Sequence, residues 1–221
     1  MTDKEILSHI DHTLLKAFAG WEEIQTLCEE ALRYGTASVC IPPSYVKRVK
    51  DRFPALNVCT VIGFPLGYNP EGIKAAEALR AVQDGASEVD MVVNIGDVKN
   101  GDFDRVSAEI RSVREAIGEG PILKVIVETC YLTEDEKINL CGCVGDGKAD
   151  YIKTSTGFGT AGATIEDVRL FKKHIGGGVK IKAAGGVKTR EDLERFIAEG
   201  ADRIGTSSAV KLLAVEEAKA Y

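Results

Sequence analysis

The phrase "DGASEVDMVV", residues 84–93, places a glycine and small residues directly before a short apolar strand. Three other stretches repeat this order: "YGTASVCI" (34–41), "DGKADYIKT" (146–154) and "EGADRIGTS" (199–207). Each follows a segment with the apolar spacing of a helix, and a glycine just past a helix is the usual left-handed cap. We therefore interpret each phrase as the end of a helix, a turn and a strand.

Extending this pattern along the chain gives eight strand-then-helix units. The expected strands are residues 10–14, 38–41, 57–62, 88–93, 123–128, 151–153, 179–183 and 203–205. Strict alternation predicts a parallel sheet with right-handed crossovers. Eight units without a linker favour a closed (β/α)8 barrel, the TIM barrel, as a single domain over residues 1–221. The alternative is an open doubly wound sheet, but its glycine fingerprint does not follow the first strand.

Several helix starts carry capping signals. A threonine is followed three residues later by an acid in three places: Thr133 with Glu136, Thr164 with Asp167 and Thr189 with Asp192. This spacing is typical of a capping box. Asn69 followed by Pro70 predicts an N-cap with proline in the first helical turn.

The composition limits the classes of partner. A net charge of −6 argues against a nucleic-acid-binding surface, which needs clustered basic residues. No run of about 18 apolar residues is present, so we expect no membrane span. The first ten residues contain acids and lack the apolar core of a secretory signal, so we expect a cytoplasmic protein.

Cysteine and histidine give little sign of a metal or a disulfide. The six cysteines are scattered, mostly in apolar runs, and we expect buried free thiols. His9 and His12 are three residues apart at the first strand, which points their side chains to opposite faces. We therefore expect no metal.

Charged residues at the strand ends indicate chemistry. Lys153 and Lys182 come from neighbouring strands, the sixth and seventh, and Asp90 comes from the fourth. A single strand lysine is more often structural than catalytic. Two ammonium groups side by side in a partly buried site, however, disfavour each other's charge and so produce a nucleophilic amine. Asp90 could then shuttle protons during Schiff-base chemistry with a carbonyl substrate.

The last two strands lead into glycine and serine. Gly185 and Gly186 follow strand seven, and Ser207 and Ser208 follow strand eight, at the two loops where barrels commonly bind phosphate. The glycines allow close approach of backbone N–H groups, and the serines add hydroxyl donors. Together they predict a phosphate site, to which "STGFG" after strand six adds more glycine backbone.

At this point a family resemblance becomes visible. "EVDMVVN", "LKVIVET", "ADYIKTSTG", "KAAGGVKT" and "RIGTSSA", in this order, closely resemble the deoxyribose-phosphate aldolases, as do "IDHTLL", "ASVCIPP" and "VIGFPLG". The resemblance covers nearly the whole chain. It implies a class I lyase without metal or cofactor that reversibly cleaves 2-deoxy-D-ribose 5-phosphate to acetaldehyde and D-glyceraldehyde 3-phosphate. It also implies a role in deoxynucleoside catabolism and a homo-oligomer, dimer or tetramer.

The resemblance also implies roles for individual residues. Lys153 would form the Schiff base, Lys182 would lower its pKa, and Asp90 would donate or accept a proton through a water. Lys124 would join this polar network, and Asp11, Thr13 and Cys40 would line the substrate end. The residues matching the phosphate-binding stretch are Gly157, Gly185, Gly186, Val187, Gly205, Ser207 and Ser208.

Three positions raise questions within this resemblance. Members often carry a lysine just after "STG", where this chain has Phe158, and an arginine after "GGV", where it has Lys188. Either the phosphate is held less tightly, or backbone groups and helix N-termini carry most of its binding. Tyr221 ends the chain and could act as a proton relay, although chain termini are usually disordered.

Two other functions remain open on the residues alone. A phosphosugar isomerase or synthase on the same barrel would use the same phosphate loops with acid–base carboxylates. A barrel that only binds a phosphorylated metabolite is equally compatible with the fold. Neither function needs a pair of strand-end lysines beside Asp90, so this pair favours the aldolase.

Overall fold

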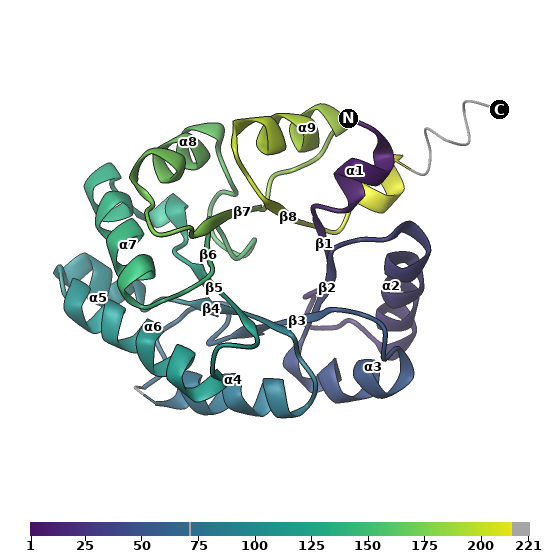
Figure 1. Cartoon of the computed structure of the whole chain (residues 1–221), viewed down its shortest axis with the longest axis horizontal. Helices are drawn as coiled ribbons and strands as arrows, with labels where there is room; N and C mark the ends of the chain where they lie inside the picture. Colours follow the sequence, from purple (N-terminus) through teal and green to yellow (C-terminus); the bar gives the residue numbers. More distant parts are fainter. Residues whose placement is uncertain (71, 214–221) are drawn as a thin grey trace.

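Eight parallel strands close into a barrel in the computed structural model, which describes residues 1–70 and 72–213 (Figure 1). The strands are β1 Ile10–Thr13, β2 Ser38–Ile41, β3 Val58–Ile62, β4 Glu88–Val92, β5 Ile122–Ile126, β6 Tyr151–Lys153, β7 Lys180–Ala184 and β8 Arg203–Thr206. Each strand pairs with the next in the sequence, and β8 pairs with β1. The predicted closed barrel is therefore confirmed, and the open doubly wound sheet is wrong.

Helices form a ring around this barrel (Figure 1). Nine α-helices have both ends in the described residues: α1 Asp3–Leu7, α2 Trp21–Tyr34, α3 Val46–Arg52, α4 Ile73–Gln83, α5 Ile95–Asn100, α6 Phe103–Ile117, α7 Glu134–Asp146, α8 Ile165–His174 and α9 Arg190–Glu199. Residues 209–213 are also helical. Two short 3₁₀ turns, η1 Pro43–Tyr45 and η2 Thr129–Tyr131, follow β2 and β5. The amino-terminal helix α1 and the short α5 lie outside the predicted units.

The predicted strand ends agree with the structure to within one residue, except at β5. That strand ends at Ile126, two residues before the predicted end at Glu128. Glu128 instead has a φ of 55°, in the left-handed region that strands do not use. The prediction that this strand continues to residue 128 was therefore wrong.

Three of the four capping predictions are confirmed. The side chains of Thr133, Thr164 and Thr189 each accept a hydrogen bond from the backbone N–H three residues later. The fourth prediction, at Asn69 and Pro70, is wrong. Helix α4 begins only at Ile73, and its N-cap is Gly72, whose φ of 82° sets the helix start after Pro70.

Two glycines after helices take the predicted left-handed conformation, and a third does not. Gly35 and Gly200 take left-handed conformations at the ends of α2 and α9. Gly147, after α7, has a φ of −76°, and the next residue, Lys148, takes the positive φ. A Cβ at Gly147 would lie 2.3 Å from Cγ2 of Ile110, so this glycine is needed for close packing of α7 on α6.

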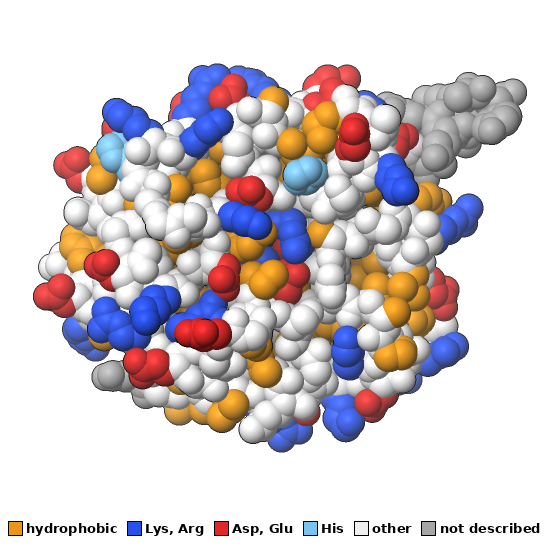
Figure 2. Space-filling view, in the orientation of Figure 1, with side chains coloured by type: hydrophobic (Ala, Val, Ile, Leu, Met, Phe, Trp, Pro, Cys, Tyr) orange, Lys and Arg blue, Asp and Glu red, His pale blue; other side chains and the backbone are white. Residues whose placement is uncertain are grey.

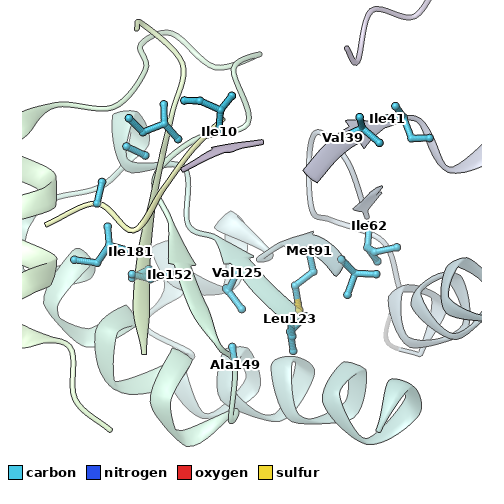
Figure 3. Close-up of a cluster of buried hydrophobic side chains, with 14 of the residues drawn as sticks. Ile10, Val39, Ile41, Ile62, Met91, Leu123, Val125, Ala149, Ile152 and Ile181 are labelled. Atoms are coloured by element: carbon cyan, nitrogen blue, oxygen red, sulfur yellow. The ribbon is translucent and has the colours of Figure 1, made fainter. Parts of the chain in front are cut away.

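The main hydrophobic core lies between the strands and the helices. Outward-facing aliphatic side chains fill it, including Ile10 of β1, Met91 of β4, Ile152 of β6 and Ile181 of β7, all at most 3% exposed (Figure 3). The barrel interior has a different character. A smaller apolar cluster of Cys40, Cys59 and Val61 lies apart from the main core. On the face seen in Figure 2, acidic and basic side chains lie together over the barrel axis.

The six cysteines are free; five are buried, as predicted, and Cys130 is partly exposed. His9 contacts the carbonyl oxygen of Asp202, and His12 contacts the carboxylate of Glu30. Among the described helices, none has both the length and the apolar character required for crossing a membrane.

A buried ion pair links α4 to α6. Lys74 is 1% exposed, and its Nζ lies 2.7 Å from Oε1 of Glu109 and donates to the carbonyl oxygen of Val92 at 2.8 Å. Burial lowers the pKa of Lys74 and raises that of Glu109, against the attraction between the two charges. Desolvation therefore dominates, and the pair is held by the surrounding packing.

We predict that Lys74→Met destabilises the protein by about 3 kcal/mol, because it leaves the Glu109 carboxylate buried without its cation. The double variant Lys74→Met/Glu109→Leu should recover most of this loss, since it removes both charges. Urea unfolding measures each free energy of unfolding. As a control, Lys47→Met breaks the exposed Lys47–Asp51 pair and should cost less than about 1 kcal/mol. Equal losses at the two lysines would contradict the prediction.

Candidate active site

Seven charged side chains meet inside the barrel. They are Asp11 of β1, Glu88 and Asp90 of β4, Lys124 of β5, Lys153 of β6, Lys182 of β7 and Arg203 of β8. Ion pairs join strands that are not neighbours, such as Asp11 of β1 and Lys124 of β5, so these side chains project inward. Barrel interiors are usually filled by branched aliphatic residues, and this departure marks a site.

Asp90 is the centre of the cluster. Its Oδ2 accepts hydrogen bonds from Nζ of Lys153 at 2.8 Å and from Nζ of Lys182 at 2.7 Å. Its Oδ1 accepts from Nζ of Lys124 at 2.8 Å and from the thiol of Cys59 at 3.2 Å. The structure thus brings the three residues predicted as catalytic, Asp90, Lys153 and Lys182, together with Lys124.

The electrostatics keep most of the cluster charged. Burial raises the pKa of Asp90, but the three lysines outweigh burial and hold that pKa well below its usual range. Burial lowers the pKa of Lys182, but Asp11 and Asp90 outweigh it and hold the pKa above its ordinary value. The same balance, with Asp90 and Glu88, raises the pKa of Lys124. Asp90 is therefore a carboxylate, and Lys182 and Lys124 are fixed ammonium groups.

Lys153 is distinguished from the other two lysines by its partners. Among the described residues, its Nζ forms an ion pair with Asp90 alone, whereas Lys182 pairs with Asp11 and Asp90 and Lys124 pairs with Asp11, Glu88 and Asp90. The four cations and three carboxylates leave one excess positive charge. Among the described residues, Lys153 is therefore the cation of the cluster with the fewest ion pairs.

Asp11 and Arg203 complete the cluster at the seam between β1 and β8. Oδ2 of Asp11 lies 2.5 Å from Nζ of Lys182, and its Oδ1 accepts from Arg203. Arg203 also pairs with Glu88 at 3.0 Å. Burial raises the pKa of Asp11, but Lys182 and Lys124 outweigh it and lower that pKa. Asp11 therefore holds Lys182 in place.

A cavity of about 270 Å³ opens where the strands end. It is lined by residues that follow β1, β6, β7 and β8, with Lys153 among them. All seven residues predicted to bind phosphate line it: Gly157, Gly185, Gly186, Val187, Gly205, Ser207 and Ser208. Thr13 lines it as predicted, whereas Asp11 and Cys40 are fully buried and do not belong to the lining.

The glycine backbone of the cavity is required by its geometry. Gly185 and Gly186 have φ values of 77° and 78°, which other residues rarely adopt. A Cβ at Gly162 would lie 2.4 Å from the carbonyl carbon of Gly185, so the loop after β6 packs directly on the loop after β7. A Cβ at Gly205 would lie 3.2 Å from Cε of Lys182, so this glycine leaves room for that lysine.

Glu128 fixes the loop after β6. The side chain is 3% exposed and accepts hydrogen bonds from the backbone N–H of Thr156 at 3.2 Å and from the hydroxyl of Thr156. Thr156 and the next residue, Gly157, both line the cavity. Glu128 follows β5 with its backbone in the left-handed region, and its carboxylate therefore holds the residues on one side of the cavity in place.

The two departures from the family pattern occupy different places. Phe158 lines the cavity, is 55% exposed and packs edge-on against Phe64 at 5.3 Å between ring centroids. Lys188 is exposed and is not part of the cavity lining. Its backbone N–H donates to the carboxylate of Asp192 at the start of α9. Tyr221 lies outside the described residues.

Several site residues were missed by the sequence reasoning. Glu88 and Arg203 are each two positions from a residue that was selected, Asp90 and Gly205, so the period-two rule could have found them. Lys16 and Thr156 line the cavity from loops, where no periodicity places a side chain.

Two sets of side chains have the spacing of metal ligands. Cys40, Cys59 and Asp90 form one set, and Asp11, Cys59 and Glu88 form the other; in each, the ligand atoms lie within 4.8 Å of one another. The carboxylates of both sets already pair with Lys124, Lys182 or Arg203. Burial also raises the pKa of Cys59, which keeps it a thiol. A metal ion here would have to displace ammonium groups. These carboxylates and thiols are therefore better suited to pairing with lysines than to binding a metal ion.

Comparison with known proteins agrees with this geometry. Residues 6–215 match the model of the DeoC/LacD family aldolases. A curated relative from Clostridium botulinum (strain Alaska E43 / Type E3), named deoxyribose-phosphate aldolase, is 58% identical over the full length of both chains. One of the same name from Clostridioides difficile (strain 630) is 55% identical over 99% of this chain and 100% of its own.

A solved structure supports the same assignment. Deoxyribose phosphate aldolase from Aeropyrum pernix superimposes with a TM-score of 0.90 at 32% identity, covering 99% of this chain and 93% of its own. The family model and the curated relatives together span the barrel, the charged cluster and the cavity loops. The chain belongs to the DeoC/LacD family of aldolases.

Proposed function

We propose that this chain is a class I aldolase that reversibly cleaves 2-deoxy-D-ribose 5-phosphate to acetaldehyde and D-glyceraldehyde 3-phosphate. The observation that carries the proposal is Lys153, which lies in the wall of a cavity of about 270 Å³ and, among the described residues, forms an ion pair with Asp90 alone. The relatives of 55–58% identity bear the name of this activity. An isomerase, a synthase or a binding protein gives this lysine no task.

In this proposal the neutral amine of Lys153 attacks C1 of the open-chain sugar, and loss of water gives a protonated Schiff base. The iminium accepts the electron pair as the C2–C3 bond breaks, and the hydroxyl on C3 gives up its proton. D-Glyceraldehyde 3-phosphate leaves. The remaining enamine takes a proton at C2, and hydrolysis releases acetaldehyde and restores the lysine.

Asp90 and Lys182 act on these proton transfers. Asp90 is ionised, so it first accepts a proton, with a water between its carboxylate and C2 of the substrate. Lys182 donates to the same oxygen of Asp90 as Lys153 does, so its fixed positive charge disfavours a second ammonium at Lys153. Lys124 and Asp11 hold this pair in position, and Thr13 contributes to the substrate side of the cavity.

The glycine-rich end of the cavity is proposed to receive the phosphate. Its donors would be backbone N–H groups of the predicted loops and the hydroxyl of Ser207, which is exposed. Ser208 already donates to the carbonyl oxygen of Val187 at 3.3 Å, which joins the loops after β7 and β8. Cys40 lies buried beside Cys59 and belongs to the interior of the barrel in this proposal.

The setting of the enzyme is part of the same proposal. We propose that residues 1–221 act as one cytoplasmic domain in deoxynucleoside catabolism, without a metal or organic cofactor. We also propose a dimer or tetramer, because the relative from Aeropyrum pernix is described as a tetramer. Light scattering after size exclusion should give a mass of two or four chains, and a single-chain mass would contradict it.

Borohydride trapping tests the Schiff base. Incubation with acetaldehyde and reduction should add one ethyl group to Lys153, found by peptide mapping, because reduction fixes the imine as a secondary amine. Lys153→Met should give no adduct and should lower kcat by at least about 10⁴-fold, since its covalent route is lost. Lys153→Arg, which keeps a cation for Asp90, controls for loss of the ion pair and should be equally inactive. An adduct on another residue would contradict the proposal.

The role of Lys182 is tested by the pH at which the adduct forms. In Lys182→Met three cations face three carboxylates, so deprotonating Lys153 leaves an excess negative charge. The midpoint of adduct formation should therefore rise by about one pH unit or more. Lys180→Met removes the same charge two residues earlier on β7, from an exposed side chain, and should leave the midpoint unchanged. The same midpoint in both variants would show that Lys182 does not tune the amine.

A further inference from the structure

A phosphate bound in the cavity would need a positively charged side chain nearby. A phosphate monoester carries a charge between about −1.5 and −2 at neutral pH, and backbone N–H groups and hydroxyls supply no net charge to balance it. Among the described residues, the basic side chains in the cavity lining are Lys153 and Lys16. Lys153 is committed to the carbonyl carbon in the proposed function. Lys16 therefore stands alone in the lining as a cation free for the phosphate.

The other candidate cations do not reach this cavity. Phe158 stands where the resemblance led us to look for a lysine, and it presents an aromatic ring to the cavity. Lys188 follows "GGV", but it lies outside the lining, beside the first turn of α9. Phe158 and Leu15 contribute apolar side chains to the lining, so the charge has to come from Lys16, the residue after Leu15.

The backbone of Lys16 is held while its side chain is free to turn. The N–H of Leu14 donates to the carbonyl oxygen of Cys40 at 2.9 Å, and the N–H of Ala19 donates to that of Lys16 at 3.0 Å. The hydroxyl of Tyr45 donates to the carbonyl oxygen of Ala19 at 2.9 Å. These bonds fix the loop at both ends of the turn.

The Lys16 ammonium makes a weak contact with an aromatic ring. Nζ lies 5.7 Å from the ring centroid of Phe18, near the limit of about 6 Å for a cation–π contact, and Phe18 is itself 79% exposed. A charge-assisted hydrogen bond to a phosphate oxygen is stronger than an exposed contact of this kind. A phosphate in the cavity will therefore draw the ammonium away from Phe18.

We infer that Lys16 is the phosphate-binding cation of this enzyme and sets its preference for phosphorylated aldehydes. The inference rests on the proposed function and names the residue that gives it substrate specificity. Lys16 turns from the ring of Phe18 to the phosphate that sits against Gly185, Gly186 and Ser207. The loop after β1 thereby supplies the charge that the loops after β6 and β7 lack.

Aldol synthesis with two acceptors tests this role. Acetaldehyde is the donor, and D-glyceraldehyde 3-phosphate and D-glyceraldehyde are the acceptors. In Lys16→Met, kcat/KM for the phosphorylated acceptor should fall about 10- to 100-fold, mainly through KM, as expected for loss of one charged hydrogen bond. The value for D-glyceraldehyde should fall by no more than about twofold. Lys188→Met is the matched control and should change neither value.

A second measurement uses inorganic phosphate as the probe. With D-glyceraldehyde as acceptor, phosphate should inhibit the wild type competitively, and Lys16→Met should raise its inhibition constant about 10-fold or more. Equal losses for both acceptors, an unchanged ratio, or an effect of Lys188→Met as large as that of Lys16→Met would overturn the inference.

Failure of the inference can be separated from failure of the proposed function. Trapping with acetaldehyde and borohydride needs no phosphate, so Lys16→Met should still form the Lys153 adduct. A wild type that forms no adduct contradicts the aldolase proposal. A wild type that forms the adduct, together with a Lys16→Met variant that keeps its preference for the phosphorylated acceptor, contradicts only the assignment of Lys16.

Discussion

The carboxylate of Asp90 binds three ammonium groups in the interior of the barrel, and the remaining charged residues are arranged around that contact. A buried carboxylate next to one lysine is an ordinary ion pair. Here Lys124, Lys153 and Lys182 share it, so each would repel the others without the negative charge between them. Asp11 and Glu88 then neutralise the lysines on their other sides. The result is a buried cluster in which four cations face three carboxylates.

Such an interior concentrates charge and does not stabilise the fold. Burying charges is costly, and removing one partner leaves its neighbour buried and uncompensated. The protein separates the two requirements in space. Aliphatic side chains on the outer face of the strands pack against the helices and supply the hydrophobic stabilisation, while alternate residues on the same strands carry the charges. On β4, for example, Asp90 points into the charged interior, and the next residue, Met91, packs in the hydrophobic core between the strands and the helices.

The sequence predicted the strand ends to within one residue except at β5, because glycine, small residues and an apolar run recur in the same order. Lys153, Lys182 and Asp90 were selected as charged residues near the ends of predicted strands, and Gly185, Gly186, Ser207 and Ser208 by their place after the seventh and eighth strands. The failures occurred where tertiary packing decides. Gly147 is glycine because of Ile110 on another helix, and Gly72 delays α4 beyond Pro70. Lys16 lies on a loop, and nothing in the local pattern indicates that it faces the cavity.

The ion pair between Asp11 and Arg203 joins residues that are 192 positions apart in the chain. During synthesis on the ribosome, Asp11 emerges with the first strand, and its guanidinium partner emerges with the last. Until β8 is available, Asp11 lacks one of its cations and the barrel has two open edges. Contacts between such distant residues form late in folding because a long loop must close first. Lys153 thus acquires its final electrostatic surroundings only when nearly the whole polypeptide has been made.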